Sequence, residues 1–350
     1  MFSKLYVPFL LGLSLRAASP QNCSVEQGQA YIDNGRYGQA VREFTCVIDA
    51  QPTEVAGYRG RIEAQLLLGE FSNAVRDYAR ITAYVKPVHA DAQATILDGY
   101  AARLKTSPNS IPVLTGSSFA RWWYFDYTQA IKLLKRLVEL APKDVYANLF
   151  LGSSRALSGV GAPQGVLDLD RAILLSPSSP DVRYIVADAY TYGLHDPTRA
   201  FAEASNALNW GLDTPRIHAI LASAYTAFGN QPAAAEQIRI HLDQVTSQMV
   251  PTSPLNPGAS SSLPLVPGRT YEVPLPVTAG QSIAIATSSH DFWDTILVLL
   301  GPDGIPVAGS DDYSKYFAGL DWTASTTGTY RMRVSSFESV DTGELVVTRK

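Results

Sequence analysis

The stretch YIDNGRYGQAVREF, residues 31–44, decides the fold of the first half of this chain. A single helix would carry Gly35 in its middle, where glycine costs roughly 1 kcal/mol relative to alanine. Two helices joined by a tight turn at Gly35 avoid that cost. The small Ala40 then allows the second helix to approach the first, and Phe44, one turn later, fills the space between them. The stretch therefore predicts a helical hairpin.

The same spacing returns 34 residues later, in LLLGEFSNAVRDY. The matching pairs are Gly35 and Gly69, Tyr37 and Phe71, Ala40 and Ala74, and Phe44 and Tyr78. This period resembles the tetratricopeptide repeat, in which antiparallel helix pairs stack into a right-handed solenoid with a concave groove. The resemblance implies an all-α solenoid, and looser copies of the pattern extend it to about six hairpins over residues 21–248.

One copy departs from the 34-residue rule. Before the helix predicted from Tyr127, residues 106–126 form an additional segment, which we expect to be a loop inserted into the solenoid. Its tryptophans, Trp122 and Trp123, have two interpretations. In the first, the aromatic residues pack the insertion onto the solenoid or extend the following helix backwards. In the second, they form an aromatic contact surface for a partner.

The repeat register makes the two cysteines informative. Cys23 is the third residue of the first repeat and Cys46 the twenty-sixth. In an antiparallel hairpin that turns near the fourteenth residue, the repeat position numbers of two residues that face each other add up to about 29. The position numbers of these two cysteines do so. The pair is therefore expected to form a disulfide that staples the terminal hairpin, with two buried thiols as the alternative.

The concave groove of such a solenoid is expected to hold a protein or peptide partner. The first helix of each repeat lines the groove, at its second, fifth, ninth and twelfth or thirteenth positions. Together with the two tryptophans above, these positions predict the binding residues Arg59, Glu63, Trp122, Trp123, Tyr146, Tyr184, Asp188 and Tyr192. The alternative for the tyrosines is packing between neighbouring helices.

The first residues are typical of an export signal. Lys4 precedes the apolar run LYVPFLLGLSL, and small residues follow at Ala17 and Ala18. Residues 1–19 are therefore predicted to be a signal peptide, with an uncleaved anchor or a misassigned start as alternatives. The apolar run is too short to span a bilayer, which needs about 20 residues. We expect an exported protein, extracellular or associated with the cell envelope, without a transmembrane segment.

The helical period ends near residue 246. Residues 249–268 are rich in proline, serine and glycine and are predicted to be a linker. Seven short runs of alternating character then predict a small antiparallel β-sandwich over residues 269–350. The fold class is therefore multidomain, an all-α helical-repeat solenoid followed by a β-sandwich.

The stretch FWDTILVLLGPDGIPVAGSDD, residues 292–312, followed by ASTTGTYRMRV, resembles the bacterial pre-peptidase C-terminal domain family. The resemblance implies a jelly-roll-like sandwich, export and an accessory role. Some relatives bind calcium through carboxylates at strand ends. The aspartates that could supply such oxygens are Asp291, Asp294, Asp311 and Asp312, with solvated turn carboxylates as the alternative.

No catalytic motif was found in the sequence. There is no H-E-x-x-H pair, no G-x-S-x-G turn and no glycine-rich phosphate loop, and the five histidines lack ligand spacing. The formal net charge of −4 gives no basic surface for nucleic acid. We therefore expect a non-catalytic protein without a cofactor.

The favoured function is an exported binding scaffold. Its solenoid would hold a protein or peptide partner, and its sandwich would attach to the envelope or to an extracellular component. Two alternatives remain. One is a glycan- or matrix-binding protein in which the sandwich, with Trp293 and Trp322, is the recognition module and the solenoid a spacer. The other is an accessory subunit of a secreted enzyme.

Overall fold

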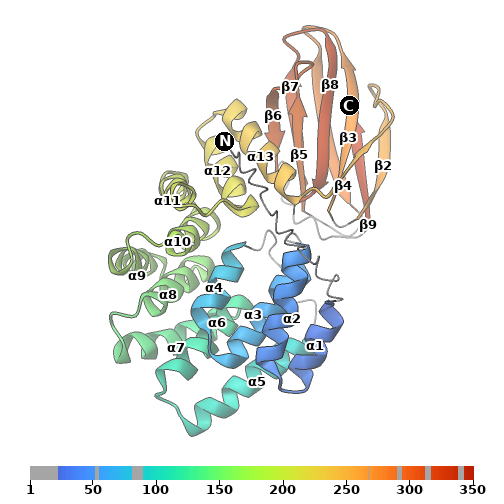
Figure 1. Ribbon diagram of the computed structural model, residues 1–350. Coiled ribbons are helices and arrows are strands. Elements are labelled where there is room, and N and C mark those ends of the chain that lie inside the picture. Colours follow the sequence, from blue (N-terminus) through green and yellow to red (C-terminus); the bar gives the residue numbers. More distant parts are fainter. Residues whose placement is uncertain are drawn as a thin grey trace, which may run out of the picture.

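The computed structural model describes residues 23–51, 55–80, 90–266, 268–289, 294–311, 317–337 and 343–350. These residues form thirteen helices followed by nine strands (Figure 1). The predicted signal segment lies outside them. The helices are α1 (Val25–Asp33), α2 (Tyr37–Ala50), α3 (Val55–Leu68), α4 (Phe71–Arg80), α5 (Ala90–Thr106), α6 (Ile111–Trp123), α7 (Tyr127–Leu140), α8 (Val145–Ser158), α9 (Ala162–Leu175), α10 (Pro180–Tyr192), α11 (Pro197–Asn209), α12 (Pro215–Ala227) and α13 (Gln231–Val245).

Twelve of the described helices pack as six sequential pairs, which confirms the helical-repeat solenoid. In several of these pairs, a glycine in the left-handed backbone conformation forms the turn between the two helices. The φ angle is 70° at Gly35, 83° at Gly69 and 73° at Gly229. A side chain is unfavourable in that backbone region, which explains why the motif carries glycine there. Ala40 and Ala74 are fully buried at the close approach of their hairpins.

The prediction of a loop insertion at residues 106–126 is wrong. Residues 111–123 form α6, which pairs with α7 as a regular hairpin, and α5 is the additional helix. Pro112 lies in the first turn of α6, where no backbone donor is required. The small residues Gly116, Ser117 and Ser118 are buried, so their size reflects close packing between helices rather than a loop.

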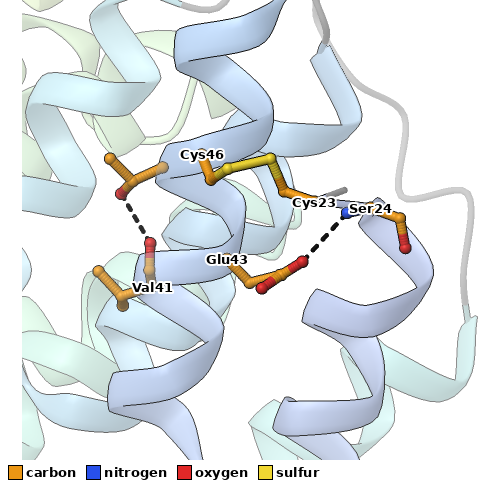
Figure 2. Close-up of a disulfide and its surroundings, with 6 residues drawn as sticks. Cys23, Ser24, Val41, Glu43 and Cys46 are labelled. Carbon is orange, nitrogen blue, oxygen red and sulfur yellow. Dashed lines mark hydrogen bonds between the residues drawn. A yellow bond between two sulfur atoms is a disulfide. The ribbon is translucent and has the colours of Figure 1, made fainter. Parts of the chain in front are cut away.

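The predicted disulfide is present. Cys23 and Cys46 are bonded across the first hairpin, with their Cα atoms 5.9 Å apart (Figure 2). Next to it, the backbone N–H of Ser24 donates to the Glu43 carboxylate at 3.1 Å (Figure 2). These two contacts tie the start of α1 to α2, in the first of the described hairpins.

Replacing both cysteines with alanine is expected to lower the free energy of unfolding by about 3 kcal/mol. The bond closes a loop with a sequence separation of 23, and removing it returns that conformational freedom to the unfolded chain. Chemical denaturation of the oxidised protein and the double variant measures the difference. A reductant should destabilise the oxidised protein by the same amount and leave the variant unchanged. A difference near zero would contradict this account of the terminal hairpin.

The nine strands form two sheets that face each other, and the predicted β-sandwich is confirmed. The orders are β1-β3-β8-β5-β6 and β2-β9-β4-β7. The strands are β1 (Gln248–Pro251), β2 (Ser260–Leu265), β3 (Arg269–Val277), β4 (Ser282–Ser289), β5 (Thr295–Leu300), β6 (Pro306–Ser310), β7 (Gly319–Thr323), β8 (Gly328–Ser336) and β9 (Gly343–Arg349).

The prediction of a linker at residues 249–268 is also wrong. β1 pairs in parallel with β3, and β2 pairs antiparallel with β9. Leu263 and Leu265 on β2 are buried in the sandwich core. The segment is therefore part of both sheets, and the chain passes from α13 into the sandwich almost directly.

The sandwich packs against the last helical hairpin, where α13 runs beside β5 and β6 (Figure 1). A second apolar core joins the two parts, made of Ala219, Ala222, Ala235, Ile238, Leu242, Ile296, Val298, Leu300 and Phe337. Every residue of β5 is buried, because one face of the strand packs inside the sandwich and the other faces the helices. An ion pair from Arg333 to Asp243, with N and O 2.9 Å apart, lies at the rim of this contact.

Candidate functional site

Most residues predicted to line the groove are brought together in the interior of the solenoid. The side chains of Arg59, Glu63, Trp122, Trp123, Tyr184 and Asp188 are buried. Tyr146 is half-buried, and Tyr192 is 36% exposed. Most of the predicted groove positions are therefore buried, and Tyr78 of α4 is one of the side chains packed against them.

Tyr78 on α4 fills the space that a ligand of the concave face would occupy. Its ring centroid lies 4.9 Å from that of Trp122, 5.3 Å from that of Trp123 and 6.0 Å from that of Tyr184. These three residues belong to α6 and α10, so one side chain joins two non-adjacent helices of the concave face. The Trp122 indole N–H donates to the buried Ser153 hydroxyl at 3.0 Å, which fixes its orientation. In this arrangement the tryptophans are part of the packed core.

The charged residues predicted for the groove are paired inside the protein. On α3, the Arg59 guanidinium and the Glu63 carboxylate are 3.4 Å apart. Burial, and then the negative charge of Glu63, raise the pKa of the nearby Tyr124 phenol well above its usual value. On α10, Asp188 pairs with Arg216 of α12 at 3.3 Å. This second ion pair joins helices from different repeats.

Arg216 is a contact residue that the sequence analysis missed. Its guanidinium lies over the Tyr192 ring, 4.3 Å from the centroid, and 5.6 Å from the centroid of Phe337 in the sandwich. It is the second residue of α12, one of the positions that the repeat rule assigns to the groove, but no residue of this hairpin was among those predicted. The contact explains how Tyr192 is held although it is partly exposed.

A cleft of about 410 Å³ lies beside Tyr146, a half-buried predicted groove residue. The N-terminal ends of α4, α6 and α8 surround it, and Tyr146 is the predicted groove residue that reaches it. The lining residues are Gly69, Glu70, Asn73, Ile111, Pro112, Thr115, Asp144 and Tyr146. Sequence reasoning missed the three from α6, because that helix was expected to be a loop.

The cleft combines an apolar floor with negative charge. Ile111 is 41% exposed, and the Tyr146 ring packs on Phe150 at 6.2 Å between centroids. Glu70 accepts a hydrogen bond from the Asn73 amide at 3.2 Å, and the Asp144 carboxylate caps α8 by accepting from the Ala147 N–H at 2.8 Å. Among the described lining residues the only ionisable acids or bases are these two carboxylates and the tyrosine. An extended segment with a basic side chain next to an apolar one matches this surface.

The described residues hold no group of three side chains suited to a metal ion. Two of the four aspartates considered for calcium, Asp291 and Asp312, lie outside the described residues, as does Trp293. None of the helices that the structure describes has the length and apolar character needed to cross a membrane.

Residues 25–93 match the family model described as tetratricopeptide repeat. Among solved structures, a thermophilic TPR protein of Thermus thermophilus is 19% identical, with a TM-score of 0.35 over 59% of this chain and 100% of that one. MamA from Desulfovibrio magneticus RS-1 is 14% identical, with a TM-score of 0.38 over 50% of this chain and 94% of that one.

The C-terminal part is similar to another solved structure. The pre-peptidase C-terminal domain of a collagenase from Bacillus anthracis is 12% identical, with a TM-score of 0.25 over 29% of this chain and 95% of that domain. No curated protein matches the sequence. Residues 25–93 thus match the tetratricopeptide repeat, and they lie within the described array of helical hairpins, a fold suited to binding proteins.

Proposed function

We propose that this protein is an exported, non-catalytic scaffold that binds a segment of a protein partner in the cleft between α4, α6 and α8. The observation that carries the proposal is the cleft itself, which a predicted groove residue, Tyr146, helps to line, while most of the other predicted groove residues are buried. Its half-buried tyrosine offers contact area at low entropic cost, and its carboxylates favour a basic side chain of the partner.

Export and attachment complete the proposal. The disulfide in the first hairpin is typical of oxidising compartments outside the cytosol, and residues 1–19 have the character of a signal peptide. The sandwich is proposed to attach the protein to the cell envelope or to an extracellular component. Because it packs firmly on α13, it would hold the cleft at a fixed orientation to that surface.

A displayed library of random peptides, selected on the full chain, tests the cleft. We expect enrichment of peptides that carry lysine or arginine beside an apolar residue. For the best such peptide, Tyr146→Ala should weaken binding by about 2 kcal/mol, as for a central contact residue. Glu70→Lys should weaken it less, by about 1 kcal/mol, and more at low salt than at high salt.

Two matched variants control for indirect effects. Tyr225, another half-buried tyrosine, packs on Phe201 in the last hairpins, and Glu139 is exposed on α7. Tyr225→Ala and Glu139→Lys should leave peptide binding unchanged. If the selected peptides are acidic, or if the cleft variants bind them as the unmodified protein does, the cleft is not the partner site.

A further inference from the structure

A second site lies at the open edge of the sandwich, where it meets the helices. β6 is the last strand of one sheet and β7 the last strand of the other, so both sheets end on the same side. There, a pocket of about 450 Å³ opens between these strands and the last hairpin. Its lining residues are Ser223, Thr226, Gln231, Ala308, Gly309, Ser310, Asp311, Gly319, Leu320, Asp321 and Trp322.

The walls of this pocket are held in fixed positions. A Cβ atom at Gly309 would lie 2.9 Å from the side chain of Ile238 and 3.3 Å from the backbone of Ala235, so β6 touches α13 directly. The Gly319 N–H donates to the Ser310 hydroxyl at 3.4 Å and joins β7 to β6. The pocket therefore requires both parts of the chain, and neither part has it alone.

The lining is unusual in combining a tryptophan with hydroxyl, amide and carboxylate groups. Trp322 is half-buried and packs edge-to-face on Tyr330, with ring centroids 4.8 Å apart. This contact fixes the indole as a rigid apolar surface. Around it, the hydroxyl and amide groups of Ser223, Thr226 and Gln231 can donate to or accept from the hydroxyls of a ligand, and the carboxylates of Asp311 and Asp321 can accept from them.

We propose that this pocket binds a neutral saccharide unit. A sugar ring has an apolar C–H face that suits the indole, and a rim of hydroxyls that suits the polar groups. An anionic ligand does not fit, because the ionisable side chains among the described lining residues are carboxylates. A cation is less favoured, since uncharged hydroxyl and amide groups form the helical wall.

Calorimetric titration of the full chain with soluble cellotetraose, laminaritetraose, maltotetraose and chitotetraose tests the proposal. We expect at least one to bind with a dissociation constant of about 1 mM or lower. Trp322→Ala should weaken that binding at least tenfold. Ser223→Leu, which places a larger apolar side chain in the pocket from the helical side, should do the same. Circular dichroism and melting curves show whether each variant is folded.

Trp210→Ala is the matched control, because Trp210 is 43% exposed on the solenoid and lies outside the pocket. It should bind as the unmodified protein does. The proposal is overturned if none of the four saccharides binds, or if both pocket variants are folded and bind normally. It is also overturned if spermidine, a cationic probe, binds in a Trp322-dependent manner and the saccharides do not. These outcomes are independent of the peptide site, since the cleft residues are not among those of the pocket.

Discussion

Replacing Trp122 with alanine is expected to lower the free energy of unfolding by about 4 kcal/mol, the cost of emptying a large aromatic site in a packed core. The side chain is only 4% exposed and contacts the rings of Tyr78, Phe119 and Phe150. Its loss also leaves the fully buried Ser153 hydroxyl without the indole N–H. Chemical denaturation followed by circular dichroism measures the change.

Trp210→Ala provides the comparison. This tryptophan is exposed and has an Arg183 guanidinium 5.3 Å from its ring centroid, so its removal should cost less than about 1 kcal/mol. The pair of variants separates the two interpretations of the aromatic segment. If the Trp122→Ala variant is as stable as the unmodified protein but no longer binds the selected peptides, the tryptophan is a partner contact. Its side chain would then not be buried in the core when the partner binds.

Stability is expected to fall by about 3 kcal/mol as the pH is lowered from 6.5 to 4, because of His241 alone. Complete burial lowers the pKa of this histidine to about 4, although the carbonyls of Pro215 and Phe337, 2.9 and 3.1 Å from its ring nitrogens, act in the opposite direction. The unfolded chain binds a proton below pH 6.5, whereas the folded protein does not until about pH 4. The folded state therefore loses stability as the pH falls.

The variant His241→Gln isolates this contribution. A glutamine amide can donate to one of the two carbonyls but does not titrate. Urea denaturation measures the unfolding free energy of both proteins at a series of pH values. The difference between the two proteins should change between pH 6.5 and 4, because the carboxylates contribute equally to each protein and only the histidine differs. Parallel curves would contradict the assignment. Because His241 lies between the solenoid and Phe337 of the sandwich, the effect reports on the junction of the two parts.

The features that could be predicted from the sequence are those set by neighbouring residues. Gly35 and Ala40 mark one hairpin, and the recurrence of their pattern after 34 residues marks the next. The repeat register then places Cys23 opposite Cys46. The alternating runs after residue 268 similarly marked seven of the nine described strands. In each case the pattern depends on contacts within a hairpin or along one strand.

The features that could not be predicted depend on contacts between distant segments. SSSLPL looks like a linker until β9, about 80 residues later in the chain, supplies its hydrogen bonds. The small residues of α6 look like a loop until helices on both sides bury them.

The same limit applies to the candidate site. Phe44 and Tyr78 occupy the same repeat position, and both are buried as the period requires. Phe44 packs against Gly28 of α1 and Gly60 of α3. A Cβ atom added at Gly28 would lie 2.5 Å from the Phe44 ring, and one added at Gly60 would lie 2.2 Å from it. Tyr78 instead reaches α6 and α10. The repeat predicts that this position is buried but not against which helix, and that choice decides how much of the concave face is open.

The burial of β5 on both faces bears on how the chain is made. During synthesis the N-terminal helices emerge first, and the outer face of the last hairpin, with Ala235, Ile238 and Leu242, stays uncovered until β5, β6 and Phe337 have left the ribosome. In the same interval β5, whose residues are all apolar after Thr295, has no cover on either side. The nascent protein would thus carry two exposed apolar surfaces, the outer face of the last hairpin and β5, and only one face of β5 packs on that hairpin in the folded protein. A chaperone that shields apolar segments before synthesis is complete would act mainly here.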